Sequence, residues 1–141
     1  MEYLQVFDEN KNMLDEKIDR ELKKTLTGNK FFMIVLLFIE NESKFLLQKT
    51  SVLRNSEIAT TGGHVIFGDD GYKTVFKEAK EELGVILDKT LLKYVETIIR
   101  NNCYMEVYYT NQKIDINDIV IQEEEVECVN WYSIDYNFPK S

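Results

Sequence analysis

The stretch that most constrains the fold is residues 62–85, which read GGHVIFGDDGYKTVFKEAKEELGV. Apolar side chains recur there at helical spacing, so residues 72–83 are predicted to form an amphipathic helix. Asp69 or Asp70 is placed to cap its N-terminus, and Gly84 suits the left-handed position that ends a helix. The residues expected on its apolar face are Tyr72, Val75, Phe76, Ala79 and Leu83.

The opposite face of this helix carries three glutamates. Glu78, Glu81 and Glu82 stand at i, i+3 and i+4, so their carboxylates emerge on one side, where like charges repel by a few tenths of a kcal/mol per pair. A shared cation would offset that repulsion, and oxygen ligands suit Mg²⁺ or Mn²⁺ rather than zinc. Gly62 and Gly63 allow close backbone approach, which lets a carbonyl oxygen point at the same ion.

The first 28 residues are predicted to be an N-terminal extension, made of a hairpin and a helix. Residues 2–14 have the pattern of a small hairpin with polar turn residues in its middle. Over residues 15–26, apolar side chains recur at four-residue steps, which predicts a helix that Gly28 ends.

The rest of the chain is rich in strand patterns. Residues 31–39 are too uniformly apolar to alternate, which favours a central strand covered on both faces. Further strands are predicted at 44–50, 92–99, 103–110 and 127–132. Strands outnumber helices, and the helices are scattered among them. The predicted class is therefore α+β, an α/β/α sandwich around a central mixed sheet, in one domain over residues 1–141.

Composition argues against several classes of function and cellular location. The net charge is −8 and no large Lys/Arg cluster is visible, which argues against a nucleic-acid partner. The longest apolar run, residues 31–39, is about half the length of a bilayer-spanning helix, and the N-terminus has no signal-peptide pattern. Cys103 and Cys128 lack metal-ligand spacing and a disulfide-rich context, so they are expected to be packing residues. We therefore expect a cytoplasmic protein with no membrane partner.

The spacing within residues 63–85 closely resembles the Nudix box. That box reads Gly, five residues, Glu, seven residues, Arg-Glu, an aliphatic, any residue, Glu-Glu, any residue, Gly, an aliphatic. Every position is met here except two: Asp69 replaces the first Glu and Lys77 replaces the Arg. Both changes keep the charge, but Lys77 loses the bidentate fork with which an Arg holds carboxylates.

The resemblance extends to the branch of this family that includes isopentenyl-diphosphate isomerase and its hydrolase relatives. It is carried by the opening hairpin and helix, by LLQK at residues 46–49 and by QEEEVECVNWYS at residues 122–133. The resemblance implies the Nudix fold, a homodimer as a possible assembly, and a Mg²⁺-dependent (or Mn²⁺-dependent) pyrophosphohydrolase. Its substrate would be a small molecule, a nucleoside diphosphate linked to another moiety.

By the same resemblance, Glu78, Glu81 and Glu82 are the expected metal ligands, with the carbonyl of Gly63 as a backbone ligand. Glu81 and Glu82 are also candidates for the catalytic base.

Some family members place a further catalytic Glu downstream of the box. Glu125 stands at that place with Glu123 as its rival, and the alternative is a solvated loop. Arg54, in the loop before the glycines, is a candidate phosphate contact or an ordinary exposed arginine. For His64, the only histidine, a role at a strand end is favoured over that of a base.

Two other functions compete with hydrolysis. Isomerisation in this family uses a Cys just ahead of the box, and residues 58–65 contain none. A nucleotide-sensing module that has lost turnover is the other alternative, supported by the changes at Asp69 and Lys77. The tyrosines at 104, 108 and 109 either stack on a base or, as is usual for an aromatic strand, lie in the core.

Overall fold

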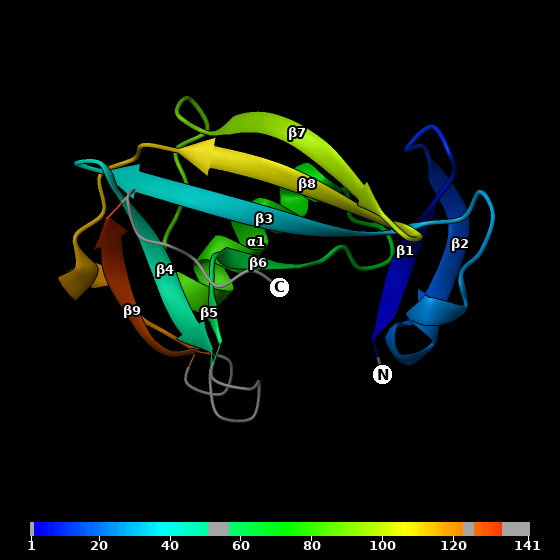
Figure 1. The fold of residues 1–141 in the computed structure, drawn as a ribbon, viewed down its shortest axis with the longest axis horizontal. Helices are drawn as coiled ribbons and strands as arrows, with labels where there is room; N and C mark the ends of the chain where they lie inside the picture. The colour runs from blue at the N-terminus through cyan, green and yellow to red at the C-terminus, as the bar shows by residue number, and fades with distance from the viewer. Residues whose placement is uncertain (1, 51–56, 123–125, 134–141) are drawn as a thin grey trace.

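A computed structural model describes residues 2–50, 57–122 and 126–133 of the chain. The strands, in chain order, are β1 (Tyr3–Phe7), β2 (Met13–Asp19), β3 (Phe32–Asn41), β4 (Lys44–Thr50), β5 (Ile58–Ala59), β6 (Thr61–His64), β7 (Lys93–Arg100), β8 (Cys103–Thr110) and β9 (Val126–Ser133) (Figure 1). The helices are α1 (Gly71–Leu83) and two short 3-10 helices, η1 (Arg20–Thr25) and η3 (Ile116–Asp118). No helix among these residues is long and apolar enough to cross a bilayer.

The described strands form a mixed sheet and a separate hairpin. The sheet has the order β5-β4-β3-β8-β7, with β6 also paired to β3 and β9 to β4. The β3–β8 pair is parallel and the others are antiparallel. Figure 1 shows β3, β8 and β7 side by side across the upper part of the molecule and the hairpin of β1 and β2 at the opposite end from β4 and β9. This architecture is the predicted α+β class with a mixed sheet.

The predicted amphipathic helix is confirmed, and it packs on the sheet. Asp70 caps α1, since its carboxylate accepts a hydrogen bond from the Lys73 amide at 2.8 Å, and Gly84 ends it at a φ of +69°. Val75, Ala79 and Leu83 are buried against the sheet as expected. Tyr72 is the exception on that face: it is 46% exposed and packs edge-on against Phe76.

The predicted helix over residues 15–26 is wrong. Residues up to Asp19 belong to β2, which pairs with β1 in register Tyr3↔Asp19, and only the following turn is helical, as η1. Pairing with β1 satisfies the backbone of this segment, so long-range hydrogen bonds override the leucine spacing. The extension is thus a hairpin followed by a 3-10 turn, joined to the sheet by bridges Leu4↔Ile66 and Phe7↔Phe31.

The central position of β3 is confirmed, but its two faces are not equally covered. Met33, Val35, Leu37 and Ile39 are buried on one face, which belongs to the core that α1 covers. The alternate side chains are only partly buried by the described residues; they are Phe32, Ile34, Leu36 and Phe38. The strand therefore alternates in burial although its sequence does not alternate in polarity.

Candidate active site

The glycine pair and the helix carboxylates meet in one cavity. β6 pairs with β3 and also contacts α1, and a cavity of about 280 Å³ opens where these elements meet. Gly63, Glu78, Glu81 and Glu82 all line it. The structure therefore brings together the whole predicted ligand set.

Glu82 is the most firmly held of the three glutamates. Its side chain is 7% exposed, and its Oε2 accepts a hydrogen bond from the Gly62 amide at 3.1 Å. The Gln48 side-chain amide on β4 donates to Oε1 at 3.4 Å. These contacts fix the carboxylate from β6 and β4 at once, so Glu82 is oriented before any ligand arrives.

Gln48 is a site residue that sequence reasoning missed. It is 5% exposed, and its Oε1 has no hydrogen-bond partner among the described residues. The available signal was a glutamine in the otherwise apolar run FLLQ at residues 45–48. A buried polar side chain in such a run needs a polar neighbour, and the helix carboxylate is that neighbour.

Glu78 lies directly against Gly63. A Cβ built on Gly63 would stand 2.5 Å from the Glu78 Cδ and 2.6 Å from its Oε1, so only glycine leaves room for this carboxyl group. Burial, followed by the charges of Glu82 and Glu81, raises the pKa of Glu78 to about 8. A negative charge on Glu78 is therefore costly at this position unless a cation offsets the burial and the repulsion from the other glutamates.

The two residues that depart from the box pattern contact each other. Lys77 Nζ lies 3.6 Å from Asp69 Oδ2, with both side chains partly exposed. Lys77 also lowers the pKa of Glu78, against the larger effects of burial and of the other glutamates. Asp69 is not the helix cap, because Asp70 takes that place. Asp69 and Lys77, the two residues that differ from the box pattern, therefore form an ion pair beside the carboxylates of the helix.

The donor set fits a hard divalent cation by its chemistry. All the candidate ligands are oxygens, and the clustered carboxylates carry charge that a cation would neutralise. Within the described ranges, no three His, Cys, Asp or Glu side chains already converge at metal-ligand spacing. Glu81 is exposed and Glu78 only partly buried, so both can rotate toward the fixed Glu82. Glu78, Glu81, Glu82 and the Gly63 carbonyl are the residues that would hold the ion.

Several other predicted residues can now be placed. His64 ends β6 as expected and stacks on Phe32 with ring centroids 6.0 Å apart. Tyr104 and Tyr108 are buried in the core. Arg54 and Glu125, with its rival Glu123, lie outside the described residues, so their roles stay predictions.

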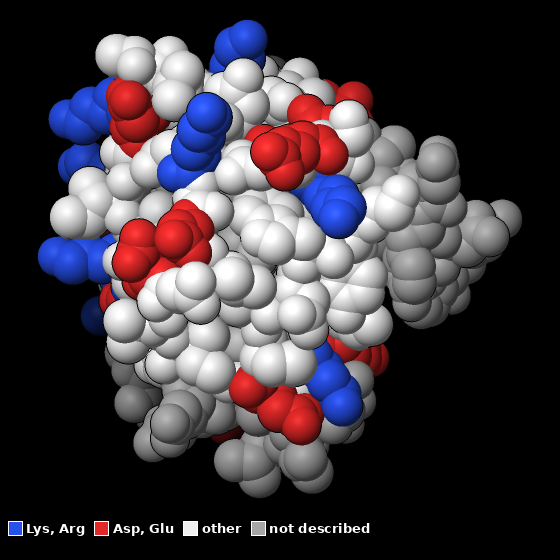
Figure 2. Space-filling model, turned by 90° about the vertical axis from the view of Figure 1, so that its left-hand side faces the viewer, with Lys and Arg blue, Asp and Glu red and all other residues white. Residues whose placement is uncertain are grey.

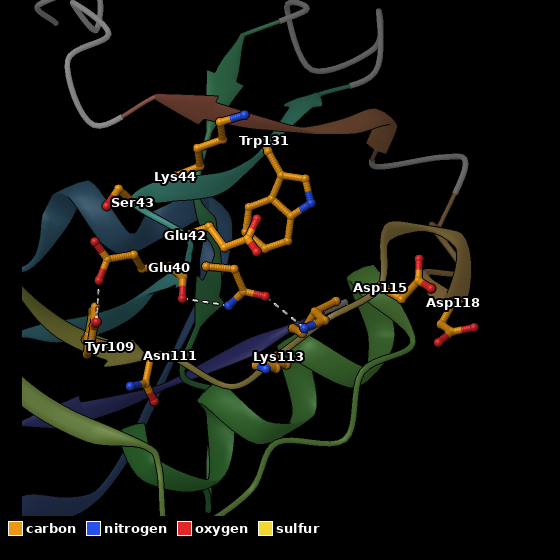
Figure 3. A pocket seen from close by; sticks show the side chains of 12 residues that line it. Glu40, Glu42, Ser43, Lys44, Tyr109, Asn111, Lys113, Asp115, Asp118 and Trp131 are labelled. Carbon is orange, nitrogen blue, oxygen red and sulfur yellow. Dashed lines mark hydrogen bonds between the residues drawn. The ribbon is translucent and has the colours of Figure 1, made fainter.

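A larger cavity, of about 850 Å³, lies elsewhere, at the turn between β3 and β4. Figure 3 shows the Trp131 indole with Lys44 and Glu42 at its rim, and Asp115 and Asp118 on the η3 segment. It shares no lining residue with the carboxylate cavity. Acidic and basic side chains are interspersed over this end of the molecule (Figure 2). Both acidic and basic side chains line this cavity.

Comparison with known proteins identifies the fold. No protein-family model and no curated protein matches the chain. Among solved structures, protein DR0079 of Deinococcus radiodurans superposes with a TM-score of 0.73 and 18% identity, covering 94% of this chain and 83% of that one. A MutT NUDIX hydrolase from Burkholderia pseudomallei gives a TM-score of 0.61 and 21% identity, covering 78% of this chain and 88% of its own.

An Ap4A hydrolase from C. elegans gives a TM-score of 0.53 and 21% identity, covering 73% of this chain and 86% of that one. The chain has the Nudix fold. At these identities the likeness concerns the fold alone. Within this Nudix fold, the segment with the box spacing is the β6–α1 unit that lines the carboxylate cavity.

Proposed function

We propose that the protein is a Nudix hydrolase that uses Mg²⁺ or Mn²⁺ to cleave the diphosphate bond of a nucleoside diphosphate linked to another group. The observation that supports this most is the convergence of Gly63, Glu78, Glu81 and Glu82 on one cavity, at box spacing, within the Nudix fold. The acidic composition agrees with a substrate that is held through a cation.

The proposal assigns roles to several residues in and beside this cavity. A bound divalent ion supplies charge neutralisation of the diphosphate and an acidified water. Glu82, oriented by Gly62 and Gln48, is the fixed ligand. Exposed Glu81 is placed to accept a proton from water. Arg20 lines the same cavity from the N-terminal extension, where it pairs with Glu2 at 2.9 Å, and it would contact a phosphate oxygen by exchanging that partner.

The alternatives are separable. Isomerase activity remains an alternative prediction. That chemistry would use a cysteine at the site, and neither Cys103 nor Cys128 is among the residues that line the carboxylate cavity. A sensing module would bind nucleotide without turnover. The cytoplasmic location and the homodimer also remain predictions.

Hydrolysis of a panel of nucleoside diphosphate derivatives tests the proposal. With Mg²⁺ or Mn²⁺, we expect nucleotide release that Glu82→Gln lowers by about 100-fold or more, since a fixed charge at the reacting centre is lost. Glu96→Gln, an exposed glutamate on β7, is the matched control and should keep full activity. Equal rates for the wild type and Glu82→Gln would refute the assignment, and ligand binding without product would favour the sensing module.

A further inference from the structure

A third cavity in the Nudix fold is lined by basic side chains, in contrast to the carboxylate cavity. It measures about 720 Å³ and lies between η1, the start of β3 and the turn that joins β7 to β8. Lys23, Lys24 and Arg100 line it, and no Asp or Glu among the described residues does. The chain has 25 acidic and 17 basic residues, so a cavity whose charged lining residues are all basic runs against the overall composition.

Within the described part of the chain, these cations have no acidic partners. Among the residues that the structure describes, none of the three forms an ion pair with a carboxylate. Burial, followed by the charges of Arg20 and Lys24, lowers the pKa of Lys23. An anion in the cavity would relieve that repulsion and complete the coordination of the ammonium groups.

One of the cations is held in place by aromatic rings. Lys23 Nζ lies 2.8 Å from His64 Nε2 and 5.2 Å from the centroid of the Phe32 ring. A protonated lysine can only donate, so the imidazole Nε2 is the acceptor in this pair. Phe32 and His64 stack with an interplanar angle of 14°. The ammonium is therefore positioned over a flat apolar surface rather than swinging free in solvent.

The basic cavity adjoins the carboxylate cavity. His64 lines the carboxylate cavity, follows Gly63 directly, and contacts Lys23 of the basic cavity. η1 spans both, since Arg20 at its start lines the carboxylate cavity and Lys24 lines the basic one. A ligand bound at the carboxylates can thus continue past His64 toward the cations.

We propose that the basic cavity binds a phosphate group on the far part of the substrate, so that the preferred substrates carry a phosphate beyond the diphosphate that is cleaved. Lys23, Lys24 and Arg100 contact that phosphate, and the Phe32–His64 surface supports the moiety that bears it. The first part, anion binding, stands on the cavity alone. The second part rests on the proposed function.

The binding test uses inorganic pyrophosphate and protein freed of divalent metal by a chelating resin. Without metal the carboxylates repel phosphate, so calorimetric binding at low salt reports the basic cavity. Lys23→Gln and Arg100→Gln should each weaken binding by roughly 10-fold, the cost of one charge-assisted hydrogen bond. The control is Lys93→Gln, at the other end of β7 from Arg100, and it should change binding less than about twofold. The proposal is overturned if the wild-type protein does not bind pyrophosphate, or if Lys23→Gln and Arg100→Gln both bind pyrophosphate as tightly as the wild type.

The catalytic test compares substrates that differ by one phosphate, NADP⁺ with NAD⁺ and coenzyme A with its dephospho form. We expect the phosphate-bearing member of at least one pair to have a kcat/KM roughly 10-fold higher, through KM, with the preference lost in Lys23→Gln and retained in Lys23→Arg. Hydrolysis of both members with no preference, or a preference unchanged in Lys23→Gln, overturns the substrate inference. If the variants weaken metal-free pyrophosphate binding but neither these four compounds nor the wider panel of nucleoside diphosphate derivatives is hydrolysed, the anion site stands and the proposed function is refuted instead.

Discussion

Replacing each of the two adjacent glycines of β6 by alanine should affect the protein differently: Gly62→Ala should mainly lower stability, and Gly63→Ala should mainly lower activity. A Cβ on Gly62 would lie 2.2 Å from the carbonyl oxygen of Val35 and 3.4 Å from Cα of Leu36, both backbone atoms of the central strand. A Cβ on Gly63 would instead meet the end of the Glu78 side chain, at 2.5–2.9 Å. The first obstacle is fixed, whereas the second can rotate away.

The expected magnitudes follow from that difference. In Gly62→Ala, β6 must separate from β3, which costs about 1–3 kcal/mol of overpacking and about 1 kcal/mol for each weakened hydrogen bond. A loss of about 3 kcal/mol lowers Tm by roughly 10 °C in a domain of this size. In Gly63→Ala only Glu78 changes rotamer, at about 1 kcal/mol, so Tm should fall by no more than a few degrees while metal-dependent activity is lost.

Thermal unfolding followed by circular dichroism, on metal-free protein, measures both effects. A double variant sharpens the test: once Glu78→Ala has removed the obstructing side chain, adding Gly63→Ala should cost almost no further stability. The reasoning is refuted if Gly63→Ala melts as low as Gly62→Ala, or if the cost of Gly63→Ala is unchanged in the Glu78→Ala background.

Two further predictions concern burial. Lys11 and Glu106 form an ion pair at 2.7 Å with side chains 31% and 11% exposed, whereas Lys30 and Glu16 pair at the same distance with 47% and 38% exposed. In urea unfolding, Lys11→Met should cost about 1–3 kcal/mol, because Glu106 loses its cation and, among the described residues, keeps only the hydrogen bond from the Tyr108 hydroxyl. Lys30→Met should cost less than about 1 kcal/mol. Equal costs for the two variants would contradict this prediction. Burial raises the pKa of the Cys103 thiol to about 11, against a smaller lowering by Lys23, while Cys128 is exposed. Iodoacetamide at pH 8, read by peptide mass spectrometry, should therefore label Cys128 first and Cys103 roughly 100-fold more slowly than an ordinary thiol, and similar rates at both cysteines would show that the prediction fails.

The local elements could be predicted because their signals lie within a few residues. The cap at Asp70, the left-handed Gly84 and the apolar face between them define α1 without reference to the rest of the chain. The carboxylate face of the same helix follows from its periodicity, so the centre of the candidate site could also be predicted. The choice between Asp69 and Asp70 as cap needed the structure, since either position satisfies the local rule.

The remaining features depend on contacts between distant segments. The sequence favours a helix at residues 15–26, yet pairing with β1 makes most of that segment a strand and leaves only η1 helical. The same pairing carries Lys23 to His64, 41 positions away, and so creates the basic cavity. Gln48 reaches Glu82 across 34 residues in the same manner. By itself, then, the sequence determined the helix and its carboxylates, because their spacing is a property of one element. Only the tertiary structure decided which amide holds Glu82 and where the cations gather, because backbone pairing between remote strands places those side chains.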